Sequence, residues 1–218
     1  MRVDLRLYAI VDPETSGGHD IAELARELAA GGATLVQLRD KKSDTPVMIA
    51  RARAIKAALG TVPLLINDRV DVALAAGCDG VHIGQEDMAA EDARRLLEPG
   101  AIIGLSIKTV AQAVAAPLDL IDYAGIGGVY GTTSKATTST PLGSAGLKRI
   151  VEEFYRRRPG FPTCGIAGIN ASNAAEVIAA GADGVSVISA LSLAPDPQAA
   201  ARRLREIVDA ALATRGRA

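Results

Sequence analysis

Short apolar runs alternate with Ala-rich segments along the whole of this 218-residue chain. Eight runs have the length and composition of buried strands, and they cover residues 7–11, 34–39, 63–67, 80–83, 102–105, 123–126, 163–167 and 184–188. Several intervening segments space apolar residues as helices do, as at 21–30, 47–59, 87–97 and 200–212. Alternating strands and helices predict an α/β fold, a closed (β/α)8 TIM barrel in the first place and an open doubly wound sheet as the alternative.

A short sequence that recurs three times supports this repeating unit. Ala-Ala-Gly begins at residues 29, 75 and 179, and a predicted strand follows each copy within a few residues. The glycine in each copy suits the end of a helix. No linker, low-complexity tract or block of charge divides the chain, so we expect residues 1–218 to form a single domain.

The composition excludes several classes of partner. Lys and Arg number 24 against 25 Asp and Glu, which leaves no basic surface for nucleic acid or for an anionic membrane. No apolar run reaches the ~18 residues of a membrane helix, and the N-terminus lacks the apolar core of a signal peptide. Cys78 and Cys164 lie in short apolar stretches and are expected to be reduced. We expect a cytoplasmic protein that acts on small molecules, and a homo-oligomer is compatible with this sequence.

The second predicted strand ends in a cluster of polar residues at 37–41, Gln-Leu-Arg-Asp-Lys. Alternation places Gln37, Arg39 and Lys41 on one face, and the apolar face should pack against helices. Two cations at the end of a barrel are costly to bury unless an anion meets them, and a diphosphate would do so. The alternative is that Arg39 and Lys41 leave the strand for solvent.

Acidic residues follow the third and fourth predicted strands. Asp68 comes directly after Asn67, and Asp87 ends the segment His-Ile-Gly-Gln-Glu-Asp at 82–87. Adjacent strands bring these loops side by side, and Mg2+ typically takes one or two carboxylates together with water and phosphate oxygens. The alternative for each residue is a helix N-cap. Beside the basic second strand, the two acids predict a Mg2+–diphosphate site.

The later strands end in residues suited to phosphate or hydrogen bonding. Residues 130–135, Tyr-Gly-Thr-Thr-Ser-Lys, combine hydroxyls with a lysine, and a flexible polar loop is the alternative. Gly168 and Ser189 follow strands seven and eight, where barrels often bind phosphate with a short extra helix, although turn glycines are the alternative. Ser106 ends the fifth strand without a local base, so we expect a hydrogen-bonding role.

Taken in order, these segments resemble the thiamine-phosphate synthase (thiamine-phosphate pyrophosphorylase) family over roughly residues 7–191. The matching pieces are residues 37–41, 66–77, 80–87, 132–135, 173–185 and 188–189. The resemblance implies a Mg2+-dependent transferase that joins 4-amino-2-methyl-5-(diphosphooxymethyl)pyrimidine to a (carboxy)thiazole phosphate. It implies thiamine phosphate and pyrophosphate as products, formed through a pyrimidine cation.

The resemblance also implies roles for single residues. Asp68 and Asp87 would hold Mg2+. The pyrimidine diphosphate would contact Gln37, Arg39, Lys41, Asn67, Ser106 and Lys135, and the thiazole phosphate would contact Thr132, Ser134, Gly168, Ile188 and Ser189. The wider set of substrate-binding residues adds Leu38, Asp40 and Thr133. Arg39, Ser106 and Lys135 would take part in catalysis.

Four positions depart from the family pattern. Gly131 and Ser134 stand where Pro and a second Thr are common, Ala167 stands where a Gly is usual, and Lys108 stands where a His is frequent. Two alternative functions are therefore open. A thiazole tautomerase of the same fold would need a positioned His, and a non-catalytic barrel would only bind a phosphorylated ligand. The paired acids and Lys135 favour the synthase.

Overall fold

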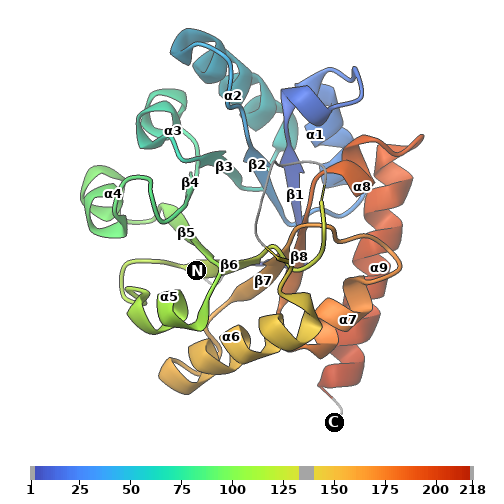
Figure 1. Ribbon diagram of the computed structural model, residues 1–218. Coiled ribbons are helices and arrows are strands. Elements are labelled where there is room, and N and C mark those ends of the chain that lie inside the picture. Colours follow the sequence, from blue (N-terminus) through green and yellow to red (C-terminus); the bar gives the residue numbers. More distant parts are fainter. Residues whose placement is uncertain (1–2, 133–139, 217–218) are drawn as a thin grey trace.

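The computed structural model describes residues 3–132 and 140–216, and its eight strands close into one parallel barrel (Figure 1). The strands are β1 (Leu7–Val11), β2 (Leu35–Leu38), β3 (Leu64–Asn67), β4 (Gly80–Ile83), β5 (Ile102–Ile107), β6 (Tyr123–Gly127), β7 (Thr163–Ile166) and β8 (Gly184–Val187). Each strand pairs with the next in the chain, and β8 pairs with β1. The predicted TIM barrel is thus confirmed, and the open sheet is excluded.

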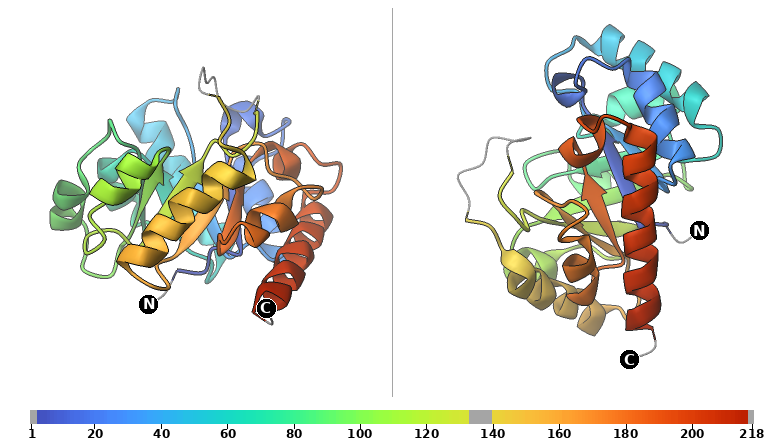
Figure 2. Two further views of the ribbon diagram at one scale, coloured as in Figure 1. Left: turned by 60° about the horizontal axis from the view of Figure 1, so that its bottom comes forward. Right: turned by 90° about the vertical axis from the view of Figure 1, so that its right-hand side faces the viewer.

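Helices form the outer layer around the strands (Figures 1 and 2). They are α1 (Ile21–Ala30), α2 (Thr45–Leu59), α3 (Val70–Ala76), α4 (Ala90–Leu96), α5 (Val110–Ala115), α6 (Gly143–Arg157), α7 (Ala174–Ala179), α8 (Ser189–Ser192) and α9 (Pro197–Arg215), with a 3-10 turn η1 (Pro13–Thr15) after β1. The helix predicted to start at Asp87 starts at Ala90 instead. Asp87 lies in the preceding turn, where its carboxylate accepts a hydrogen bond from the Gly84 N–H at 2.7 Å.

Side-chain alternation divides the strands between two cores. Outward-facing residues such as Val36 and Leu38 pack against the helices. Inward-facing residues, among them Tyr8, Leu65 and Tyr123, fill the barrel. The prediction that the apolar face of residues 36–38 packs on helices is therefore confirmed. Because Leu38 packs against the helices, its side chain, which is 1% exposed, points away from the barrel interior.

The residue before every second strand ties that strand to its predecessor. Asp79, Asp122 and Asp183 precede β4, β6 and β8, and each carboxylate accepts a backbone N–H of the strand before, at 2.8, 2.8 and 3.0 Å. Each also pairs with a cation from a helix. Before β2, the Thr34 hydroxyl bonds the backbone of Leu7 in the same way. These clamps lie at the N-terminal ends of the strands, away from the end where barrels carry function.

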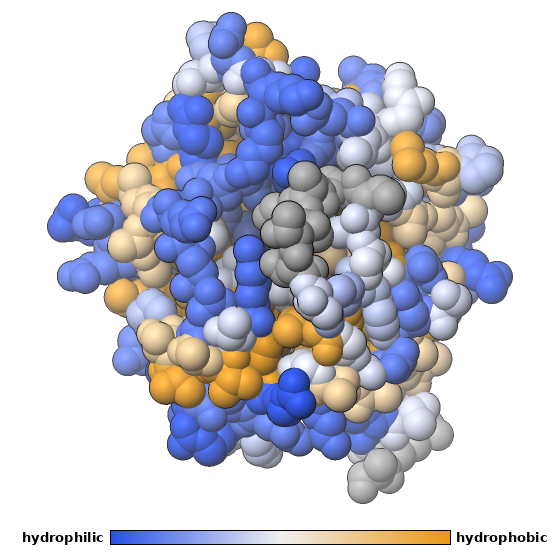
Figure 3. All heavy atoms as spheres, viewed as in Figure 1, coloured by the Kyte–Doolittle hydropathy of each residue, from blue (hydrophilic) through white to orange (hydrophobic). Residues whose placement is uncertain are grey.

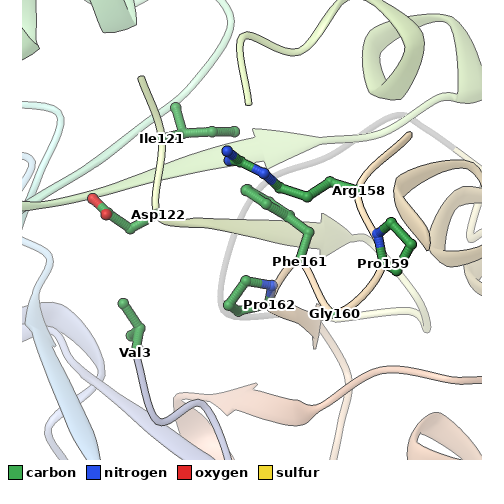
Figure 4. A pocket seen from close by; sticks show the side chains of 8 residues that line it. All are labelled: Val3, Ile121, Asp122, Arg158, Pro159, Gly160, Phe161 and Pro162. Atoms are coloured by element: carbon green, nitrogen blue, oxygen red, sulfur yellow. The ribbon is translucent and has the colours of Figure 1, made fainter. Parts of the chain in front are cut away.

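The clamped end also holds both ends of the described chain (Figure 2). A hollow of about 320 Å³ lies there, lined by residues such as Val3, Asp122 and Phe161 (Figure 4). None of the predicted site residues lines it. Within residues 3–132 and 140–216, no helix has the length and apolar character needed to cross a membrane.

Candidate active site

The C-terminal ends of the strands, called the barrel mouth below, carry most of the predicted polar residues. Figure 3 looks onto this end and shows hydrophilic residues gathered over the loops that follow β1 to β4. Arg39 and Lys41 come after β2, Asp68 after β3 and Asp87 after β4. The expected convergence of basic and acidic loops is therefore present in the fold.

Arg39 meets a buried carboxylate at the end of β1. Asp12 is 1% exposed, and one of its oxygens pairs with the Arg39 guanidinium. The other oxygen accepts the Glu14 N–H at 2.9 Å, which fixes the carboxylate in place. The prediction from the sequence placed an external anion beside Arg39 and missed Asp12. Polar residues at the C-terminal ends of barrel strands are candidate site residues, and a search of the first strand end on this basis would have found Asp12.

Lys41, Asp68 and Asp87 lie together although they follow three different strands. The Lys41 ammonium pairs with the Asp68 carboxylate, and Asp87 lies within hydrogen-bonding reach of Asp68. Burial raises the pKa of Asp68, Lys41 opposes this rise, and Asp87 adds to it. Two carboxylates this close repel each other unless a proton or a cation lies between them.

The backbone around Asp68 holds its side chain at the mouth. Asp68 has φ 61°, a left-handed conformation that few residues other than Gly adopt. Its N–H donates to the His82 carbonyl at 2.9 Å, which ties the loop to β4. Arg69 occupies the N-cap position of α3 and Ala89 that of α4, both without a side-chain cap. The helix-cap alternative is therefore wrong for both Asp68 and Asp87.

The paired acids fit the ligand chemistry of Mg2+. Carboxylate oxygens are hard donors, and Mg2+ usually completes its six ligands with water and phosphate oxygens. In the part of the chain that the structure describes, no group of three or more His, Cys, Asp and Glu gathers as a metal site. Asp68 and Asp87 would supply two carboxylates to such an ion, and water and phosphate oxygens would supply its other ligands.

Gln37 and Ser106 lie at the two ends of a line of buried polar groups. The Gln37 amide bonds the Tyr8 hydroxyl, whose oxygen lies 2.9 Å from that of Tyr123. His82 Nδ1 is 2.8 Å from the Tyr123 hydroxyl, and Nε2 is 2.9 Å from Ser106 Oγ. Burial raises the pKa of both tyrosines.

The structure corrects one expectation about Ser106. The sequence showed no base near this serine, but β4 places the His82 ring beside it. The other ring nitrogen of His82 faces a phenol and not a carboxylate, so the arrangement differs from a Ser-His-Asp triad. A hydrogen-bonding role for Ser106 remains our interpretation.

Asp40 and Asn67 are both predicted to contact the substrate, but they lie in different surroundings. The Asp40 carboxylate pairs with Arg51 of α2 and accepts the Ser43 N–H at 3.0 Å. It therefore serves the loop between β2 and α2, and a substrate contact of Asp40 would have to come from its backbone. Asn67 is half-buried at the end of β3 and lies opposite His82 in the register with β4.

The loop after β6 is described only in part. Thr133, Ser134 and Lys135 lie outside the described residues, whereas Thr132 is described and half-buried. The first residues of the loop are held against the end of β7, because the Tyr130 N–H donates to the Ala167 carbonyl at 3.1 Å. The described part of the loop therefore lies beside the seventh strand end.

Gly168 lies where only glycine fits. Its φ is 67°, and a Cβ added there would lie 2.4 Å from the Gly131 carbonyl oxygen. Ala167 also has a positive φ, of 81°, which explains why a glycine is usual at this departure from the family pattern. Ile188 and Ser189 are half-buried, and Ser189 begins α8. The short helix expected after the eighth strand is therefore present.

Residues 7–191 match the family model described as "Thiamine monophosphate synthase". The chain belongs to this family. It is 47% identical to "Thiamine-phosphate synthase" of Agrobacterium fabrum (strain C58), over 98% of both chains. It is 46% identical to the protein of that name from Moorella thermoacetica, over 93% of this chain and 95% of the relative.

Solved structures agree with the family assignment. "Thiamine phosphate pyrophosphorylase from Pyrococcus furiosus" superposes with a TM-score of 0.84 at 37% identity, covering 97% of this chain and 98% of that one. A 3-hexulose-6-phosphate synthase superposes with a TM-score of 0.66 at 17% identity, which shows the shared barrel alone. The predicted resemblance is confirmed, and so is the expected class of enzyme, a transferase of thiamine biosynthesis.

Proposed function

We propose that this member of the thiamine monophosphate synthase family joins 4-amino-2-methyl-5-(diphosphooxymethyl)pyrimidine to a thiazole phosphate with the help of Mg2+. Family membership supports the coarser function. One observation carries the finer proposal: two cations, Arg39 and Lys41, lie at the same barrel mouth as the adjoining acids Asp68 and Asp87. A departing diphosphate needs both direct cationic contacts and a metal held by carboxylates.

The diphosphate end of the substrate would lie over these four residues. Asp12 holds the Arg39 guanidinium in place, and the planar fork of Arg39 suits two phosphate oxygens. Asp68 and Asp87 would hold Mg2+, which when bound supplies positive charge next to the leaving group. Lys41, no longer needed to neutralise Asp68, would then turn to the phosphate. Lys135, which lies outside the described residues, is proposed as a further cationic contact.

The bond that breaks joins the methylene carbon of the pyrimidine to the bridging diphosphate oxygen. Its electron pair leaves with pyrophosphate, and the ring shares the positive charge that remains on the carbon. The thiazole nitrogen then supplies the electron pair of the new carbon–nitrogen bond. The reaction needs no protein nucleophile, so Ser106, Gln37 and Asn67 are proposed to orient the pyrimidine.

The thiazole phosphate would lie at the ends of β6, β7 and β8. Because Gly168 has no side chain, the phosphate could approach its backbone closely. Ser189 offers a hydroxyl and a backbone N–H. Thr132, Ile188 and the loop residues Thr133 and Ser134 complete the proposed contacts. The departures at Gly131, Ser134 and Ala167 leave this glycine and the hydroxyls in place.

The test is an assay with both precursors and Mg2+, in which pyrophosphate and thiamine phosphate are measured together. We expect equal amounts of the two products and no turnover in excess chelator. Isomerisation of a thiazole substrate alone would favour the tautomerase, although Lys108, which stands where that enzyme would place a His, is exposed. Binding of both precursors without pyrophosphate release would contradict the proposed reaction.

A further inference from the structure

Five side chains from five strands form one hydrogen-bonded line through the barrel. It runs from Gln37 on β2 through Tyr8 on β1, Tyr123 on β6 and His82 on β4 to Ser106 on β5. The first four are at most 5% exposed. Bulk water therefore does not compete for these bonds, and each bond needs one donor and one acceptor from the protein itself.

The aromatic rings of this line have little room to move. A Cβ added at Gly104 would lie 2.0 Å from the Tyr123 ring, and one at Gly125 would lie 2.9 Å from the His82 ring. His82 and Tyr123 stack with centroids 5.6 Å apart, and Tyr8 meets Tyr123 edge-on at 5.8 Å. Any reversal of the line therefore has to come from its protons and from rotation of the Gln37 amide, while the rings stay in place.

Counting protons leaves two arrangements in which every buried hydroxyl proton of the line has an acceptor within it. Each hydroxyl has one proton to donate, a neutral imidazole has one N–H and one bare nitrogen, and an amide presents either N–H or oxygen. If Gln37 donates to Tyr8, then Tyr8 must donate to Tyr123 and Tyr123 to His82, since a tyrosine that accepted from both sides would hold a buried proton without an acceptor. Every bond then points toward Ser106, and His82 carries its proton on Nε2. If Gln37 accepts from Tyr8, every bond points the other way, and His82 carries its proton on Nδ1.

The two arrangements present different groups to a ligand. In the first, Gln37 keeps its carbonyl oxygen for the ligand, and Ser106 keeps its hydroxyl proton to donate. In the second, Gln37 offers its N–H and Ser106 offers a lone pair. Either way the two ends present one donor and one acceptor, and a change at one end requires the opposite change at the other.

We propose that this line makes Gln37 and Ser106 a coupled pair that selects a heterocycle with one donor and one acceptor, with Tyr8, Tyr123 and His82 as positioning residues. The identity of the ring rests on the proposed function, since an aminopyrimidine carries an N–H donor beside a ring-nitrogen acceptor. In an oxo analogue the ring nitrogen donates and the exocyclic oxygen accepts. Replacing amino by oxo therefore exchanges donor and acceptor, and the whole line must reverse.

The tautomer of His82 reports the direction of the line. The chain has two histidines, His19 and His82, so 15N-histidine labelling gives a simple spectrum, and His19→Gln assigns it. Spectra are recorded with Mg2+ and the aminopyrimidine diphosphate, and then with its oxo analogue, without thiazole. We expect opposite neutral tautomers of His82 in the two complexes. The same tautomer in both, or a doubly protonated ring in either, would overturn the proposal.

A variant tests whether the line affects binding. Tyr123→Phe removes one hydroxyl in the middle of the line, and we expect Kd for the aminopyrimidine diphosphate to rise about tenfold, with the KM for thiazole phosphate unchanged. Tyr155→Phe is the matched control, because Tyr155 is 65% exposed on α6. Unchanged pyrimidine affinity in folded Tyr123→Phe would count against the proposal. If this variant does not fold, the wild-type spectra decide the question.

Failure of this inference and failure of the proposed function can be told apart. Pyrophosphate release by the wild-type chain reports on the function alone. Release together with one unchanging His82 tautomer would overturn the coupled pair and leave the function standing. Opposite tautomers without release would support the coupled pair while contradicting the function.

Discussion

Asp12 and Arg39 form an ion pair that joins the residue after β1 to the residue after β2 at the barrel mouth. Asp12 is almost fully buried, and the Arg39 side chain is 16% exposed. The pair keeps a cation at the mouth without a bound ligand, and it aims that cation before any substrate arrives. Such positioning before binding reduces the ordering that a substrate must otherwise bring about.

Asp12→Asn removes the charge and keeps the shape of the side chain. We expect a loss of about 2–3 kcal/mol in the free energy of unfolding, because Arg39 is left without its anion in a largely buried place. Pyrophosphate with Mg2+ would supply the missing negative charge, so it should raise the melting temperature of the variant more than that of the wild type. Thermal unfolding with and without pyrophosphate checks this, and equal shifts in both proteins would contradict it.

Asp68→Asn should abolish Mg2+-dependent turnover while leaving the protein folded. Asn tolerates the left-handed backbone at this position, so the loop should keep its conformation. We expect pyrophosphate release to fall by about a hundredfold or more. Kinetics over a range of Mg2+ concentrations measure the effect. Full activity in the variant, with an unchanged dependence on Mg2+, would remove Asp68 from the metal site.

Mg2+ binding should weaken at acidic pH. The pKa of Asp68 is raised above its ordinary value of 3.8, first by burial and further by Asp87. Without metal, the neutral acid therefore favours the folded state below the ordinary pKa, and this contribution is lost as pH rises through the raised value. Mg2+ needs the ionised form, so protons compete with it in that same window. The thermal shift caused by Mg2+, measured from acidic to neutral pH, should grow with pH, and a shift independent of pH would contradict this account.

Gly168→Ala tests close packing at the end of β7, with Gly77→Ala as the control. Both glycines have positive φ, 67° and 69°, so both alanines strain the backbone by about 1–2 kcal/mol. Gly77 has nothing within 4 Å of an added Cβ, whereas Gly168 has the Gly131 carbonyl at 2.4 Å. We expect Gly168→Ala to lose clearly more stability and to raise the KM for thiazole phosphate. Chemical denaturation and steady-state kinetics measure both, and equal effects at the two positions would contradict the packing argument.

Asp183→Ala tests the clamps at the opposite end of the barrel. The variant loses the bond to the Thr163 N–H and the pairing with Arg215, so we expect a loss of about 1–2 kcal/mol with unchanged kinetics. Asp92→Ala is the control, because its pairing with Arg95 is exposed and contributes little. Chemical denaturation measures both variants. A similar loss in the control, or a changed KM in Asp183→Ala, would contradict a purely stabilising role for the clamps.

The sequence alone determined the elements and their order. Alternating apolar residues and helical spacing reflect the local geometry of the backbone, so all eight strands lie where the sequence predicted them. The ordered motifs also identified the family. Because the C-terminal ends of parallel barrel strands meet at one side, the sequence also placed Arg39, Lys41, Asp68 and Asp87 at one mouth. The predicted start of α4 was wrong, because Asp87 bonds the turn instead of beginning a helix.

Only the tertiary structure decided which side chains meet. Asp12 and Arg39 are 27 residues apart, and Tyr8 and Tyr123 are 115 apart, yet both pairs are in contact. Such contacts depend on the closure and register of all eight strands together, which no local pattern of residues encodes. A window of sequence reports the period of the backbone, whereas a site assembled from several strand ends exists only once the barrel has closed.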